Sequence, residues 1–222
     1  PLSEETYVDT KAFSEGLAAA QDQYFKYGFI NTKGEVVIPF EYSTVSWFKE
    51  GIVAVGMNEN GKMRYAYVNK NGERLTDFLY EEAKDFQNGV GRVKLDGKYG
   101  LVVYSQKKVV LDAECDQIAY DEKDKSVVIC RKGDLYGCFN VEGKQLLPVE
   151  YESVTGYEDG RIVVKKDGRY GLYDNKGTML VAAVMHTDQV AEAHPYYQVF
   201  DTTNGREEVK VYYKDQLLDI KA

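Results

Sequence analysis

The stretches DGKYGLVV, residues 96–103, and DGRYGLYD, residues 167–174, are nearly identical although about seventy residues separate them. Asp-Gly followed by alternating aromatic and apolar residues is typical of a two-residue β-hairpin turn that leads into a strand. The same hairpin written twice in one chain indicates an internal repeat.

The rest of the chain carries the same mark at regular intervals. Tyr-Gly or Tyr-Ala pairs are spaced by 38, 34, 37 and 34 residues and begin at Tyr27, Tyr65, Tyr99, Tyr136 and Tyr170. An aromatic-x-x-Gly motif precedes four of these pairs, and an Asn/Asp-x-x-Gly turn follows four of them. Each unit therefore predicts strand, turn, strand, turn, strand, which is a three-stranded antiparallel meander of about 35 residues.

The predicted domain organisation follows from this period. A polar leader at 1–12 precedes a single β-repeat domain at 13–222. We expect an all-β fold of tandem meanders in an open, twisted stack, with a closed propeller-like ring as the alternative. Residues 191–222 form a decayed sixth unit that caps the stack, because terminal repeats are usually atypical. The five clear repeats cover 13–47, 48–85, 86–121, 122–156 and 157–190.

The hairpin register predicts which side chains share a face. With Asp167-Gly168 as the turn, Val164 faces Gly171, and the strand between the turns is apolar on both faces. Such a sheet is expected to be sandwiched between neighbouring repeats. Glycine inside a strand costs roughly 0.5–1 kcal/mol relative to alanine. We therefore expect a bulky aromatic ring of an adjacent unit to cover the bare backbone at Gly171. Tyr99 and its equivalents are then core or inter-repeat residues, with ligand stacking as the alternative.

The three cysteines are predicted to be unpaired. Cys130 and Cys138 flank one hairpin, and its register puts them on opposite faces, where a disulfide is geometrically poor. An odd number of cysteines is also no disulfide framework. We interpret Cys115, Cys130 and Cys138 as buried small hydrophobes.

No catalytic, cofactor-binding or metal-binding residues stand out. His186 and His194 are seven residues apart, which matches no standard zinc spacing. Acidic residues recur beside the third strand of most units, and this recurrence favours edge guards or turn partners over a two-carboxylate glycosidase pair. They are Glu41, Glu81, Glu82, Glu114, Glu150 and Glu152. We expect no enzyme, and a glycoside hydrolase-like activity is the weakest alternative.

The combined pattern resembles a known family, the WG repeat, which is common in bacterial proteins. FKEGIVAV from Phe48, KYGFINTKGEVVIPFEY from Lys26 and YGCFNVEGKQLLPVEY from Tyr136 carry the likeness. It extends over about 13–184, with Tyr replacing the name-giving Trp in every copy. The resemblance implies a scaffold or binding module without a transferable catalytic motif.

Composition narrows the expected partners. The net charge is −8 with no basic block, which disfavours nucleic acid. No stretch approaches the ~20 apolar residues of a membrane span. We expect a non-enzymatic binding or scaffold protein with a protein partner; the alternative is a carbohydrate-binding module at the cell envelope.

An exposed aromatic patch formed by Trp47, Phe48 and Tyr42 is the candidate binding face. The chain begins at Pro1 with a polar segment and no Met. This favours an extracytoplasmic location, in the periplasm or at the cell surface, after removal of an N-terminal signal.

Overall fold

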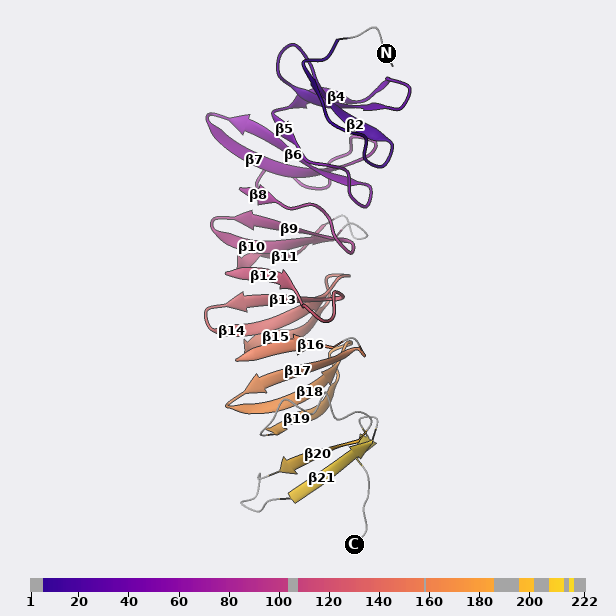
Figure 1. Ribbon diagram of the computed structural model, residues 1–222. Helices are drawn as coiled ribbons and strands as arrows, with labels where there is room; N and C mark the ends of the chain where they lie inside the picture. Colours follow the sequence, from indigo (N-terminus) through magenta and orange to yellow (C-terminus); the bar gives the residue numbers. More distant parts are fainter. Residues whose placement is uncertain are drawn as a thin grey trace. The chain divides into compact units, whose positions relative to one another are not determined.

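The computed structural model is built from β-strands (Figure 1). It describes residues 6–103, 108–157, 159–185, 196–201, 208–213 and 216–217. Within these ranges every helix or strand element is a strand, and the strands group into six sheets, which confirms the all-β class with tandem meanders. The chain divides into two compact units, Pro1–Glu114 and Cys115–Ala222.

Unit 1 contains the first three sheets, whose strands follow one another in chain order. The first sheet consists of β1 (Asp9–Thr10), β2 (Leu17–Gln21), β3 (Tyr27–Asn31) and β4 (Val36–Tyr42). The second consists of β5 (Thr44–Val45), β6 (Ile52–Glu59) and β7 (Lys62–Asn69). The third consists of β8 (Glu82–Ala83), β9 (Val90–Leu95), β10 (Lys98–Val103) and β11 (Lys108–Cys115), whose last residue opens unit 2.

Unit 2 contains the other three sheets. The fourth sheet consists of β12 (Gln117–Tyr120), β13 (Val127–Lys132), β14 (Leu135–Asn140) and β15 (Gln145–Tyr151). The fifth consists of β16 (Ser153–Gly156), β17 (Arg161–Lys166), β18 (Arg169–Asp174) and β19 (Met179–Met185). The sixth consists of β20 (Tyr196–Asp201), β21 (Glu208–Tyr213) and β22 (Gln216–Leu217).

A short additional strand precedes the aromatic-x-x-Gly motif in the sheets. Thr44–Val45 pairs with β6, so this sheet begins about four residues before Phe48, where the predicted repeat starts. Asp9–Thr10 pairs with β2 in the same way, so part of the predicted leader is the edge of the first sheet. The extra strand forms because the chain leaving one meander stays extended and hydrogen-bonds to the first long strand of the next.

The predicted hairpin register is confirmed. Lys166 faces Arg169 and Val164 faces Gly171 across the Asp167-Gly168 turn. Both turn residues have positive φ, 51° and 72°, as a type I′ turn requires. Leu95 faces Lys98 across Asp96-Gly97 in the same manner. The near-identity of the two opening stretches therefore reflects one hairpin built twice.

The predicted sandwiching is confirmed within each unit. In unit 1, one face of the second sheet packs on the first sheet, and the core between them includes Phe29, Tyr42 and Val55. Its other face packs on the third sheet through a core that includes Tyr67 and Val93. In unit 2, a shared core joins the fourth and fifth sheets. Both faces of a meander are apolar because each faces another sheet.

The aromatic-x-x-Gly motif also ties neighbouring sheets together. Glu50-Gly51 is a tight turn with both residues at positive φ. The Gly51 amide donates to the Glu15 carboxylate at 2.9 Å, and the Gly89 amide donates to Glu50 at 2.6 Å. Each glutamate thus accepts a hydrogen bond from the corresponding turn of the following sheet.

The glycine after each tyrosine has a different reason from the one predicted. A Cβ on Gly137 would lie 2.6 Å from the carbonyl oxygen of Pro148, and one on Gly28 would lie 2.6 Å from that of Ile38. Both contacts are with the backbone of the next strand of the same sheet. That strand bulges at its proline, with three residues opposite the single glycine. The expectation that an adjacent unit's aromatic ring covers this glycine is wrong at these two positions.

An aromatic ring does cover a glycine one strand earlier. A Cβ on Gly91, in β9, would lie 2.6 Å from the hydroxyl oxygen of Tyr67. Tyr67 is fully buried, reaches from the second sheet into the third, and donates its hydroxyl proton to the carbonyl of Lys84. The expected packing of ring on backbone therefore occurs at Gly91.

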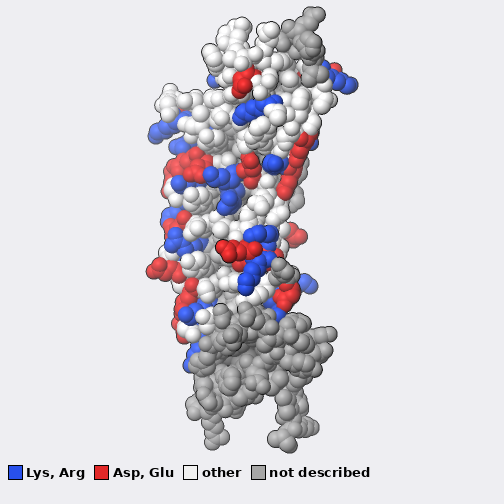
Figure 2. Space-filling model, viewed as in Figure 1, with Lys and Arg blue, Asp and Glu red and all other residues white. Residues whose placement is uncertain are grey.

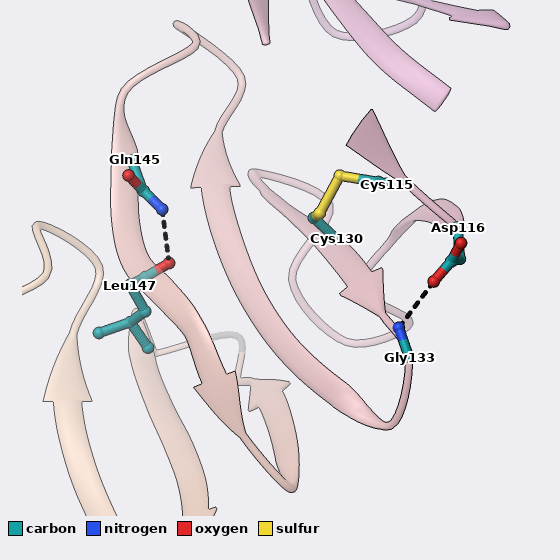
Figure 3. Close-up of a disulfide and its surroundings, with 6 residues drawn as sticks. All are labelled: Cys115, Asp116, Cys130, Gly133, Gln145 and Leu147. Carbon is teal, nitrogen blue, oxygen red and sulfur yellow. Dashed lines mark hydrogen bonds between the residues drawn. A yellow bond between two sulfur atoms is a disulfide. The ribbon is translucent and has the colours of Figure 1, made fainter. Parts of the chain in front are cut away.

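The interpretation of the cysteines as three free thiols is wrong. Cys115 and Cys130 form a disulfide, with Cα atoms 5.7 Å apart (Figure 3). Cys138 is free and buried, and it faces Ile129 rather than Cys130, as the register predicted. Cys115 follows Glu114 as Tyr42 follows Glu41 and Tyr151 follows Glu150. A cysteine at a position that otherwise holds a buried tyrosine was the available signal.

Candidate binding surfaces

The three aromatic residues proposed as a binding face do not form an exposed patch. Tyr42 and Phe48 are buried in the core between the first and second sheets, where the Phe48 ring meets Phe29 edge to face at 4.9 Å. Trp47 is 41% exposed, with the Lys11 ammonium 5.9 Å from its ring centroid. Only Trp47 of the predicted set is therefore available to a ligand.

The repeated tyrosines divide into two classes. Tyr27 and Tyr136, which precede the glycine, are partly buried and lie beside Tyr42 and Tyr151 on the next strand, which are fully buried. Burial raises the pKa of both Tyr42 and Tyr151. The interpretation of the repeat tyrosines as core or inter-repeat residues holds in part, because the first class keeps one edge in solvent.

The recurrent acids act as turn and strand partners. The Glu81 carboxylate accepts a hydrogen bond from the Gly97 amide at 3.3 Å, and Glu152 accepts one from Gly168 at 2.9 Å. Asp116 does the same for Gly133 at 2.6 Å (Figure 3). Others form ion pairs with strand lysines: Glu82 with Lys94 at 3.4 Å and Glu150 with Lys166 at 2.8 Å.

The most exposed aromatic side chains lie on the first hairpin loop, between β2 and β3. Tyr24 is 73% and Phe25 66% exposed. Asp22 organises the loop, since its carboxylate accepts from the amides of Tyr24 and Lys26, both at 2.9 Å. The Phe25 amide donates to the Asp22 carbonyl at 3.0 Å. The two rings therefore stand on a loop that is held in one conformation.

The backbone at Phe25 is in the left-handed region, with φ at 60°. A three-residue hairpin loop needs this conformation at one position, which glycine usually fills. The corresponding hairpins place Asn60-Gly61, Asp96-Gly97 and Asp167-Gly168 at their positive-φ positions. The first hairpin thus departs from its relatives by carrying exposed aromatic side chains and local strain.

Sequence reasoning did not find this loop because it searched for motifs that recur. The loop was visible as an exception, since DQYFKYG is longer and more aromatic than LDGKYG or KDGRYG. Val8 is also 54% exposed, and its amide donates to the carbonyl of Gln21, at the strand end next to this loop. Val8, Tyr24 and Phe25 together are called the apolar tip below.

Charged side chains of both signs are interspersed on the face of the molecule in Figure 2. In the described part of the chain, no group of three or more His, Cys, Asp and Glu residues is placed to hold a metal ion. His186 and His194 lie outside the described residues. The same described part contains no helix of the length and hydropathy that a membrane crossing needs.

Several solved structures resemble the chain at low identity. They include a eukaryotic initiation factor (12% identity, 97% of this chain and 65% of that chain, TM-score 0.42). Hsv2p of Kluyveromyces lactis matches at 9% identity over 76% of this chain and 61% of that chain, with a TM-score of 0.39. The WD40 β-propeller domain of Doa1 matches at 12% over 96% and 91%, with a TM-score of 0.33. The chain spans less than two thirds of the length of the first two. No curated protein matches it.

The family comparison agrees with the period found in the sequence. The model described as WG containing repeat matches at 27–62, 65–99 and 136–170, and each match contains one of the repeated hairpins. The chain thus carries WG-containing repeats, and the predicted family resemblance is confirmed in these three segments.

Proposed function

We propose that the chain is a non-enzymatic binding domain that presents its apolar tip to a partner protein. The observation that carries this proposal is Phe25, an exposed aromatic residue held at positive φ where the related hairpins have Asn, Asp or Gly. A left-handed conformation costs a non-glycine residue roughly 1–2 kcal/mol. Such strain is concentrated at functional sites.

The chemistry of the apolar tip suits a protein with a concave apolar pocket. Aromatic side chains dominate the energy of protein interfaces because they bury a large area with few rotatable bonds. The hydrogen bonds from Asp22 order the loop before binding, so less conformational entropy is lost on association. Tyr24 supplies a hydroxyl as well as a ring and sets the orientation of the contact.

A second candidate is carbohydrate binding at Trp47, which is favoured by its partly exposed indole ring. Specific binding on a glycan array that disappears in Trp47→Ala would establish this second function. Turnover of a glycoside or ester panel by the purified protein would overturn the non-enzymatic part of the proposal.

The disulfide supports an extracytoplasmic site of action, as the sequence analysis expected. Structural disulfides form and persist in oxidising compartments such as the periplasm or the cell surface. Cys115 and Cys130 are both fully buried, so the bond is shielded from reductants.

The test places a photo-crosslinking amino acid at position 25 and, as the matched control, at position 60 in the second hairpin. The proposal predicts one crosslinked partner from position 25 and none from position 60. The purified partner should then bind Phe25→Asn at least about tenfold more weakly. Phe25→Asn should also unfold at an equal or higher temperature, because Asn tolerates positive φ.

Equal crosslinking from both positions would overturn the proposal. So would unchanged affinity of the partner for Phe25→Asn. Crosslinking of the chain only to itself would replace the partner protein by a second copy of this chain.

A further inference from the structure

A cavity of about 320 Å³ opens on one face of the fourth sheet. Gln117, Arg131 and Tyr136 form one cross-strand row of its lining, and Ala119 and Ile129 form the next row. Its volume is near the lower end of the range for ligand sites, about 300–1,000 Å³. It is therefore the right size for one small molecule, and its lining combines polar, charged and apolar groups.

Arg131 enters this cavity without a counter-charge. One of its terminal nitrogens donates to the Gly133 carbonyl at 3.2 Å, whereas its Nε is buried and has no hydrogen-bond partner. The residue opposite it on β12 is the uncharged Gln117. A partly buried guanidinium with unused donors is unfavourable unless an acceptor is supplied.

The same position in two other sheets shows what Arg131 lacks. Lys94 faces Tyr99 as Arg131 faces Tyr136, and its ammonium pairs with Glu82 at 3.4 Å. Lys165 faces Tyr170 in the fifth sheet and pairs with Glu152 at 3.6 Å. Among the described residues no carboxylate pairs with Arg131, so an anionic group of a ligand could take that place.

The opposite charge lines the other side of the cavity. The Asp121 carboxylate is already engaged, because it accepts hydrogen bonds from the amides of Gly156, Lys123 and Asp124, each at 2.9 Å. Glu122 is exposed at the rim and is the acid that can receive a cation. One cation and one available acid, separated by an apolar floor, complement a ligand that carries both charges.

We propose that this cavity binds a small zwitterion, an α-amino acid with an apolar side chain. Its carboxylate would lie beside Arg131, since a guanidinium matches a carboxylate in two parallel hydrogen bonds. Its ammonium group would lie beside Glu122, and its side chain would contact Ala119, Ile129 and the Tyr136 ring. A plain anion leaves Glu122 unused, and a neutral sugar leaves Arg131 without a counter-charge.

The first test uses the full chain and four probes in calorimetric titrations: leucine, 4-methylpentanoate, 3-methylbutylamine and glucose. Leucine should bind, and each probe that lacks one of its two charges should bind at least about tenfold more weakly. Equal affinity for 4-methylpentanoate, tighter binding of glucose, or no binding of leucine at millimolar concentration would each overturn the proposal.

The second test compares matched variants. Arg131→Met should weaken leucine binding at least about tenfold, and Arg131→Lys should restore part of it. Lys165→Met removes the cation at the same repeat position of the fifth sheet and should leave leucine binding unchanged. Wild-type affinity in Arg131→Met, measured in a sample whose circular dichroism is native, would overturn the assignment. The apolar tip in unit 1 is not altered by these changes, so partner binding there should persist.

Discussion

The fourth and second sheets are built from the same repeat, yet they differ at the residue after the tyrosine. In the fourth sheet Gly137 lies under the bulge at Pro148, whose backbone leaves no room for a Cβ. In the second sheet the same position is Ala66, which is fully buried. The strand that should pair there is reduced to two isolated bridges, at Tyr80 and Arg74.

The missing strand explains the alanine. The second sheet has LTDFLYEE where the fourth has LLPVEYES, so it lacks the proline of the bulge. The Tyr67 amide donates to the side-chain hydroxyl of Thr76 at 3.1 Å instead of to a strand carbonyl. Glycine is therefore required by the bulge of the third strand, and it becomes unnecessary where that bulge is replaced by a loop.

The disulfide should give the largest difference between the two sheets. Cys130 is aligned with Val55 of the second sheet, which has no covalent tie. The bond spans 15 residues, and a loop of this length is worth about 3 kcal/mol in chain entropy. Cys115→Ala/Cys130→Ala should therefore lose about 3 kcal/mol, as measured by circular dichroism during denaturant unfolding.

Trp47 provides an internal control for this prediction. It is the single tryptophan and lies in unit 1, so its fluorescence reports that unit. The fluorescence midpoint should shift less than the circular dichroism midpoint. A double variant within about 0.5 kcal/mol of the wild type would show that the bond does not stabilise unit 2.

Gly137→Ala should give the next largest effect. The new Cβ would lie 2.6 Å from the Pro148 oxygen and 2.7 Å from the Val149 nitrogen, and both are backbone atoms. Relief requires the bulge to move, so we expect a loss of about 1–3 kcal/mol in the free energy of unfolding. A neutral result would mean that the bulge is soft and that the glycine has another reason.

Ala66→Gly is the reciprocal change and should be smaller. No bulge faces this position, and glycine in a strand is less favourable than alanine by roughly 0.5–1 kcal/mol. Denaturant unfolding followed by Trp47 fluorescence measures the effect in unit 1. A stabilised Ala66→Gly variant would contradict the explanation given for the difference between the two sheets.

Cys138 should give a pH-dependent effect, the smallest of the four. It is aligned with Tyr67, and burial raises the pKa of its thiol from 9.0 to about 12. Because the folded-state pKa is the higher one, this contribution to stability is complete below pH 9 and is lost as the pH rises toward 12. The slope of unfolding free energy against pH above 9 should be shallower in Cys138→Ala. Equal slopes, or rapid alkylation of native Cys138, would contradict its burial.

The repeat, the hairpin registers and the two-faced sheets could be predicted from sequence because each depends on neighbouring residues. Asp167-Gly168 sets its own turn, and the alternation of side chains sets the faces of β17 and β18. The period of about 35 residues then carried the family resemblance. The same reasoning separated Cys130 from Cys138, since both lie on one hairpin.

The predicted binding face could not be corrected from sequence. Trp47, Phe48 and Tyr42 are close in the chain and all aromatic, but packing between sheets buries two of them. The apolar tip and the lining of the cavity are exceptions to the repeat, and a search for recurrence passes over exceptions. Arg131 resembles Lys94 and Lys165 in sequence, and only its surroundings distinguish it.

By itself the sequence determined an all-β repeat chain, its hairpins and the pairing of its strands within each meander, because hydrogen bonds and turn chemistry act over a few residues. Tertiary structure decided which tyrosines are buried, why Gly137 must be glycine, and that Cys115 reaches Cys130. These outcomes depend on atoms that meet across sheets or across a bulge. No local pattern specifies such distances, because they result from the packing of the whole unit.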